Sequence, residues 1–70
     1  MTPGCIVKIC FFKPEGYEDT HYVETDHRGD AVGIVLLKYD NDHLKYLNYI
    51  SVTYGNLPDG FPTIKIKGIG

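Results

Sequence analysis

Glycine and proline divide this chain of 70 residues into short apolar segments, which limits the elements that it can form. The eight glycines and four prolines fall mainly between runs rich in β-branched and aromatic residues. Glycine reaches positive φ angles and proline fixes φ, so both residues favour turns. Many short elements are therefore expected in place of long helices, and the composition of the runs favours a mainly β fold.

Five runs have the composition or the alternation of β-strands. The last one alternates apolar and polar residues without a break, which predicts a half-exposed strand with Lys65 and Lys67 on its polar face. Lysines on such a strand discourage pairing with other chains when the strand lies at the edge of a sheet. The predicted strands are residues 5–12, 21–25, 31–39, 44–54 and 63–67.

Five strands joined by turns predict one small domain over residues 1–70, either a five-stranded antiparallel meander or a partly open barrel. The layout resembles the SH3-like architecture in its coarse order only, and without signature residues it implies no function. A domain of this length buries only about 60% of the surface of its unfolded chain. An exposed strand edge that pairs two copies would add stability, so a homodimer is a further expectation.

For the segment 31–50, the sequence is compatible with a hairpin and with a helix. After Asp30, which is a suitable N-cap, apolar residues recur at the spacing of a helix. Against a helix, Gly33 and its β-branched neighbours lower the helix propensity. Polar residues 40–43 favour a turn, although they also suit the start of a helix near His43. We expect a strand followed by a turn, and an α+β fold with a helix in this segment is the alternative.

Acidic residues are concentrated between positions 15 and 30, where six carboxylates stand against one arginine. Such a surface attracts basic partners, whereas nucleic-acid-binding modules present a basic field. The net charge of −2 argues in the same direction. Tyrosine is favoured in protein interfaces because its ring adds contact area and its hydroxyl can hydrogen-bond. The residues expected to bind a partner are Glu15, Tyr17, Glu18, Asp19, Tyr22, Glu24, Asp26 and Asp30.

These residues predict a non-enzymatic protein-binding module that docks on a basic macromolecular partner through an acidic loop and hairpin. An inhibitor or an adaptor fits this description, and phages and mobile elements often encode proteins of this size. The alternative is a β domain that binds single-stranded nucleic acid, because aromatic rings on a sheet can stack bases beside lysines. The residues of this alternative are Lys45, Tyr46, Tyr49, Lys65 and Lys67.

No catalytic residue, metal ligand or cofactor is expected. The only serine, Ser51, lies in a predicted strand, and neither cysteine has a histidine near it in the sequence. The histidines and aspartates follow no known spacing of metal ligands. The sequence therefore favours binding over catalysis.

The two cysteines, Cys5 and Cys10, are five positions apart, so on a strand their side chains point to opposite faces and cannot form a disulfide. Reduced thiols are typical of the cytoplasm. The apolar run at the N-terminus is too short to span a membrane and lacks the basic region of a signal peptide. We therefore expect a cytoplasmic protein without a membrane partner.

Overall fold

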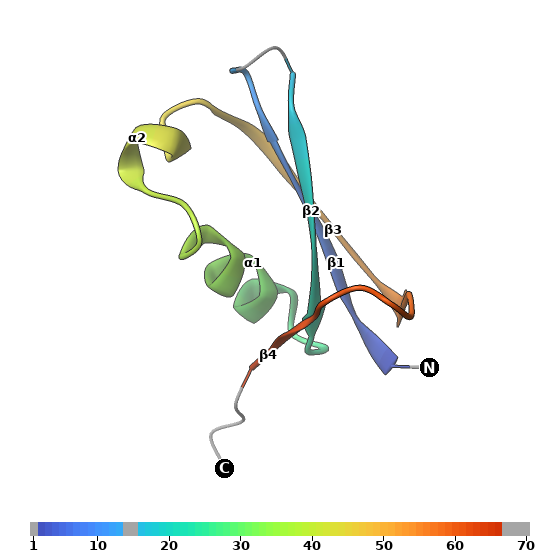
Figure 1. Ribbon diagram of the computed structural model, residues 1–70. Coiled ribbons are helices and arrows are strands. Elements are labelled where there is room, and N and C mark those ends of the chain that lie inside the picture. Colours follow the sequence, from blue (N-terminus) through green and yellow to red (C-terminus); the bar gives the residue numbers. More distant parts are fainter. Residues whose placement is uncertain (1, 14–15, 67–70) are drawn as a thin grey trace.

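The computed structural model describes residues 2–13 and 16–66 (Figure 1). It contains one sheet, and two helices lie on the same side of that sheet. The elements are β1 (Thr2–Phe11), β2 (Glu18–Glu24), α1 (Arg28–Leu36), α2 (Asn41–Leu44), β3 (Leu47–Leu57) and β4 (Ile64–Lys65). The mainly β fold predicted from the sequence is confirmed.

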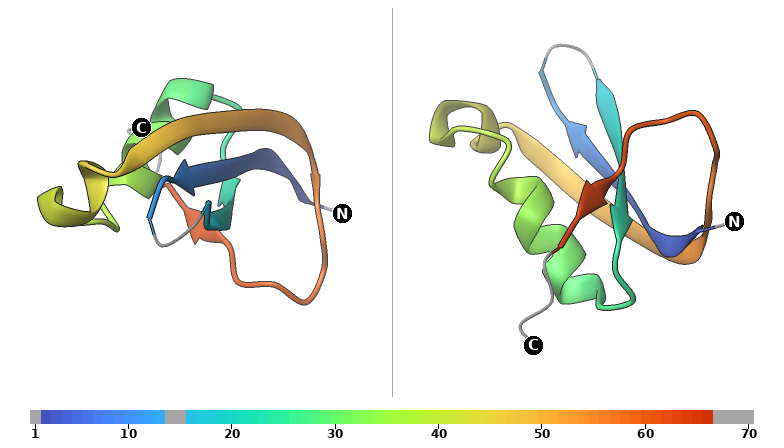
Figure 2. Two further views of the ribbon diagram at one scale, coloured as in Figure 1. Left: turned by 90° about the horizontal axis from the view of Figure 1, so that it is seen from above. Right: turned by 60° about the horizontal axis from the view of Figure 1, so that its bottom comes forward.

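The strands follow one another across the sheet in the order β3-β1-β2-β4 (Figure 2). β1 is antiparallel to both β2 and β3, whereas β4 is parallel to β2 over two residue pairs. The sheet is therefore mixed and open. The five-stranded meander and the SH3-like barrel are not found in residues 2–13 and 16–66, where the sheet has four strands. The reason is that the chain crosses over the sheet as helices after β2 and returns as β3 on the far side of β1.

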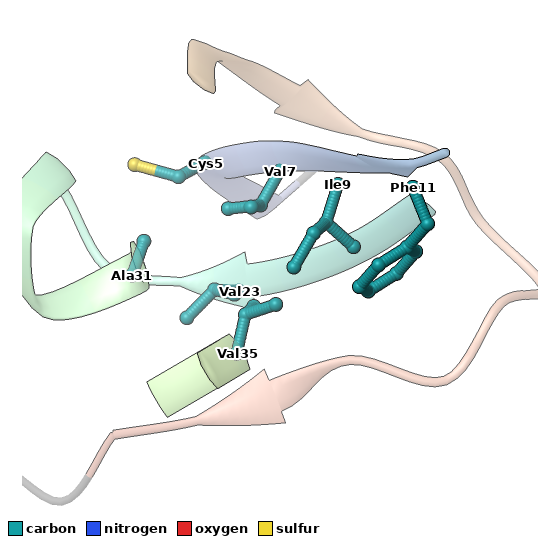
Figure 3. Packing of buried hydrophobic residues seen from close by; sticks show 7 residues of the cluster. All are labelled: Cys5, Val7, Ile9, Phe11, Val23, Ala31 and Val35. Atoms are coloured by element: carbon teal, nitrogen blue, oxygen red, sulfur yellow. The ribbon is translucent and has the colours of Figure 1, made fainter. Parts of the chain in front are cut away.

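The core lies between β1 and α1 (Figure 3). Alternate residues of a strand point to the same face, and four alternate residues of β1 point toward the helices. They meet one residue of β2 and two residues of α1. This fully buried cluster consists of Cys5, Val7, Ile9, Phe11, Val23, Ala31 and Val35.

The strand expected at residues 31–39 is wrong, and the helix alternative is confirmed by α1. Ala31 and Val35 lie four residues apart, so a helix places both on one face, where both are fully buried. Gly33 lies on the exposed side, with no atom within 4 Å of the position of a Cβ. Its propensity cost is about 1 kcal/mol, whereas burying one valine stabilises the fold by about 1.5–3 kcal/mol. Tertiary packing therefore outweighs the local preference for a strand.

The turn expected at residues 40–43 is also wrong, because α2 begins in this stretch. The carboxylate of Asp40 accepts a hydrogen bond from the backbone N–H of His43 at 2.8 Å and so caps the N-terminus of α2. β3 consequently starts at Leu47, three residues later than the predicted strand, and it extends to Leu57.

The remaining predicted strands are present with changed ends. β1 and β2 begin earlier than predicted, and β4 keeps only two residues of the strand expected at 63–67. Lys67 lies outside the described residues. Cys5 and Cys10 are free thiols, and their partners in β2 place them on opposite faces of the sheet. Neither described helix has the length and the hydropathy that a membrane crossing requires.

Candidate functional site

Because side chains alternate along β2, the predicted partner-binding residues lie on opposite faces of the sheet. Residues that pair directly across antiparallel strands face the same side. Asp19 pairs with the buried Ile9 and therefore lies on the helix side. Glu18 and Tyr22 lie on the other side, which we call the open face. The eight residues thus do not form one continuous surface, and Glu15 lies outside the described residues.

On the helix side, five side chains form a hydrogen-bonded and aromatic group that we call the inner cluster. The carboxylate Oδ2 of Asp19 accepts hydrogen bonds from the hydroxyls of Tyr17, at 2.7 Å, and Tyr39, at 2.6 Å. The Tyr39 hydroxyl uses its one hydrogen in the hydrogen bond to Asp19. In the contact of 2.6 Å between this hydroxyl and Nε2 of His21, the hydroxyl oxygen therefore accepts and Nε2 donates. The members of the inner cluster are Tyr17, Asp19, His21, Tyr39 and His43.

Phe11 of β1 fixes the inner cluster to the core. Its ring centroid lies 5.3 Å from that of Tyr17, 5.2 Å from that of Tyr39 and 4.4 Å from that of His43. Aromatic pairs at these separations stabilise a fold beyond the burial of their surface. The inner cluster therefore joins the start of β2 to the stretch that links α1 and α2.

The charges of the inner cluster are set by burial and by the hydrogen bonds and charges within it. Burial by itself raises the pKa of Asp19, but the two tyrosine hydroxyls and the neighbouring histidines lower it below its ordinary value overall. Burial and the Asp19 carboxylate raise the pKa of Tyr39, and the same carboxylate raises that of Tyr17. Burial lowers the pKa of His21 although Asp19 opposes this effect. Near pH 7, Asp19 is therefore ionised, whereas Tyr17, Tyr39 and His21 are neutral.

On the open face, the predicted residues mainly contact other parts of the chain. The thiol of Cys10 donates to Oε2 of Glu18 at 3.1 Å. A hydrogen bond with Tyr49 lowers the pKa of this thiol, but burial and the Glu18 carboxylate outweigh it, so the pKa is raised overall. The ring of Tyr22 lies 5.5 Å from that of Phe61, in the segment that precedes β4. These contacts hold the open face together.

The second half of the acidic segment lines a groove of about 680 Å³ between the end of β2 and α1, which we call the acidic groove. Glu24 lies on β2, Asp26 in the connection that follows and Asp30 in the first turn of α1. The side-chain hydroxyl of Thr63 donates to Oε2 of Glu24 and fixes its position. The charged and aliphatic residues that line the acidic groove are Glu24, Asp26, Asp30, Ile34, Leu37 and Ile66.

The acidic groove combines negative charge with exposed apolar surface. The side chain of Asp26 is 73% exposed, and its Oδ1 lies 3.4 Å from Nε2 of His27. Leu37 is 80% exposed, which is high for a leucine beside a core helix. Across residues 2–13 and 16–66, no lysine or arginine forms an ion pair with Glu24, Asp26 or Asp30. The groove is therefore suited to a ligand that carries both positive charge and an apolar side chain.

The sequence pattern indicates the acidic residues of the acidic groove but not its aliphatic residues. One signal was available for Leu37, because it follows Leu36 directly and two consecutive leucines cannot share one face of a helix. Ile66 comes from the far end of the chain, and nothing in the sequence places it beside α1. Of the two tyrosines that donate to Asp19, Tyr17 was among the predicted residues, whereas Tyr39 was missed because it is 20 positions away.

The residues of the alternative nucleic-acid site are divided between two edges of the sheet. Tyr46 precedes β3, and the Nζ atoms of Lys13 and Lys45 lie 5.3 Å and 5.7 Å from the centroid of its ring. Tyr49 lies on β3 and is 53% exposed. Lys65 lies on β4, at the opposite edge, and Lys67 is outside the described residues. The structure therefore brings Lys45 and Tyr46 together but leaves Lys65 apart from them.

Comparisons with protein-family models, with curated proteins and with solved structures found no match. Within the part of the chain that the structure describes, no group of three or more histidines, cysteines, aspartates and glutamates is placed to hold a metal ion.

Proposed function

We propose that this protein is a non-enzymatic binding module that captures a basic segment of another protein in the acidic groove. The observation that supports this proposal is the meeting of three acidic and three aliphatic residues around one groove of about 680 Å³. Lysine and arginine have apolar stems and charged ends. A partner segment that carries them could lay its stems on Leu37 and Ile34 and direct its charges to Asp26 and Asp30.

The two kinds of contact contribute differently to binding. An exposed ion pair stabilises a complex by only about 0.2–1 kcal/mol. Burying a leucine side chain that was exposed contributes about 1.5–3 kcal/mol. The aliphatic residues of the groove would thus supply most of the affinity, while the carboxylates would raise the association rate and select a basic partner.

The proposed mechanism is occlusion. A segment held in the acidic groove is unable to contact any other acidic surface or a phosphate backbone at the same time. A module of this kind acts as an inhibitor when the captured segment is itself a binding site, and as an adaptor when it is not. We place this role in the cytoplasm, and its format is that of small proteins encoded by phages and mobile elements.

The proposal is tested by selecting peptides from a random display library on the immobilised protein. The expected peptides combine lysine or arginine with leucine, isoleucine or phenylalanine. The double variant Asp26→Lys/Asp30→Lys should weaken the binding of a selected peptide about tenfold or more, because two attractive contacts become repulsive. The matched control is Asp42→Lys/Asp59→Lys, which makes the same change of charge outside the groove. Selection of acidic or neutral peptides, or equal weakening by both variants, would contradict the proposal.

Single-stranded nucleic acid is the second candidate ligand, and one observation favours it. Tyr46 is exposed and two lysine ammonium groups lie near its ring, so a stacked base would find positive charge beside it. The expected result is binding of a fluorescent oligothymidylate that weakens with salt and is lost in Tyr46→Ala. Binding that is unchanged in this variant would exclude Tyr46 as the stacking residue.

A further inference from the structure

The outer edge of β3 is the longest stretch of sheet edge in the described structure. β3 spans eleven residues, and it pairs through one side only, with β1. Across residues 2–13 and 16–66, no strand pairs with its other side. In a strand, backbone N–H and C=O groups point alternately to the two sides, so this edge presents a row of hydrogen-bonding groups.

The two edges of the sheet differ in the features that prevent strand pairing. Natural proteins protect sheet edges with short strands, with lysine and with proline. β4 has two of these features, because it is two residues long and contains Lys65. β3 is eleven residues long and contains no charged residue and no proline, and its register with β1 shifts at Asn48, near its start. Its side chains Tyr49 and Tyr54 are 53% and 47% exposed.

We infer that β3 pairs in antiparallel orientation with β3 of a second copy of this chain, which joins two four-stranded sheets into one sheet of eight strands. A two-fold axis perpendicular to the sheet brings identical strands together in antiparallel orientation and keeps the helices of both copies on one face. Like charges on opposed strands are destabilising. Because β3 has no charge, self-pairing creates no such contact within the strand.

A register centred on Val52 pairs residues 49–55 of β3, which lie beyond the register shift at Asn48. In this register Ile50 lies opposite Tyr54 of the second copy, and Ser51 lies opposite Thr53. The first pair joins an apolar side chain to an aromatic one, which is favourable across strands. Ser51 and Thr53 are exposed and lie on the open face, so their substitution leaves the core unchanged.

This inference goes beyond the proposed function, since none of the residues that line the acidic groove lies on β3. A dimer through β3 would carry two acidic grooves. A partner with two basic segments could then bind both, and the second contact would form at a high effective concentration. Dimerisation and capture of a basic segment are nevertheless separate claims, and each can fail without the other.

The test is sedimentation equilibrium of the full chain over a series of concentrations. The wild-type protein is expected to have the mass of two chains, and Ser51→Lys/Thr53→Lys should raise the dimer dissociation constant about tenfold or more. Asn41→Lys, which adds one positive charge on α2, is the control and should remain dimeric. Circular dichroism establishes that each variant is folded.

A charge-swap mixture separates loss of pairing from loss of folding. Ser51→Lys/Thr53→Lys and Ser51→Glu/Thr53→Glu should each be monomeric alone, and an equimolar mixture should form a heterodimer, because each lysine then faces a glutamate. A wild-type protein that is monomeric at all concentrations overturns the inference. It is also overturned if two folded variants fail to associate when mixed, or if the dimer persists in both variants alone.

Discussion

The two halves of the acidic segment look alike in the sequence and differ in the structure. In the first half, Asp19 is half-buried and accepts hydrogen bonds from two tyrosines. In the second half, Asp26 and Asp30 are exposed and line the acidic groove. Charge density along the chain therefore does not reveal which carboxylates face a partner. Strand alternation and contacts with distant residues decide this.

The physical reason lies in what each half packs against. Asp19 shares its face of the sheet with Ile9 and lies next to the aromatic rings around Phe11. A charge in such surroundings is tolerated only when it is hydrogen-bonded. Asp26 follows the end of β2 and Asp30 opens α1, where water reaches both side chains. The first carboxylate stabilises the fold, and the other two are available to a ligand.

The largest expected difference between the two halves is in stability. Asp19→Ala should lower the free energy of unfolding by about 2–3 kcal/mol, because it leaves two tyrosine hydroxyls without their charged acceptor. The matched substitution Asp26→Ala should change it by less than about 0.5 kcal/mol, as is usual for an exposed residue. Urea denaturation followed by circular dichroism measures both values. Equal effects of the two substitutions would remove the distinction between the halves.

The next largest effect is expected on the affinity for a peptide that binds the acidic groove. Leu37→Ser should lower the affinity for a peptide selected on the acidic groove by about tenfold. The substitution removes roughly half or more of the binding free energy that one buried leucine contributes. The stability should change little, since Leu37 is 80% exposed in the free protein. Isothermal titration calorimetry gives the affinity, with Tyr54→Ser as a control on the far edge of the sheet. Full affinity of the Leu37 variant would restrict the groove to a purely electrostatic role.

The smallest expected effect is a dependence of stability on pH. Burial lowers the pKa of His21 in the folded protein below its value in the unfolded chain, which is about 6.5. The unfolded chain therefore binds the proton more tightly, and stability is complete above about pH 6.5 and declines as the pH falls through the folded pKa. Urea midpoints at pH 7.5 and pH 5.5 should differ less in His21→Gln than in the wild type. The control is Thr20→Gln at the neighbouring exposed position of β2, which removes no ionisable group and should leave the pH dependence unchanged.

The sequence was informative where structure is set by local pattern. The β-branched and aromatic composition of β1 and the turn residues around it predicted a strand and a mainly β fold, and both are present. α1 was assigned incorrectly because its helical conformation depends on the burial of Ala31 and Val35 against β1, which no local propensity reports. Once this segment is a helix, the chain can no longer form the predicted meander.

The candidate site could be predicted only in part, because some of its residues are evident from the local sequence and others depend on contacts between distant segments. Glu24, Asp26 and Asp30 were expected to bind a partner, and all three line the acidic groove. Their separation from Asp19 follows from the register of β2 against β1, and that register became visible only in the structure. The aliphatic side of the groove depends on Ile66 and α1 coming together, which is a contact between distant parts of the chain.

An NMR titration decides whether a basic segment binds along residues 24–37 or at the inner cluster. The ¹⁵N-labelled protein is titrated with a peptide selected from the display library, and amide chemical shifts are followed for every residue. The largest shifts are expected on Asp26, Asp30 and Leu37, and they should vanish in Asp26→Lys/Asp30→Lys. Shifts concentrated on Tyr17, Asp19 and their neighbours, with the groove unchanged, would rule out binding in the acidic groove.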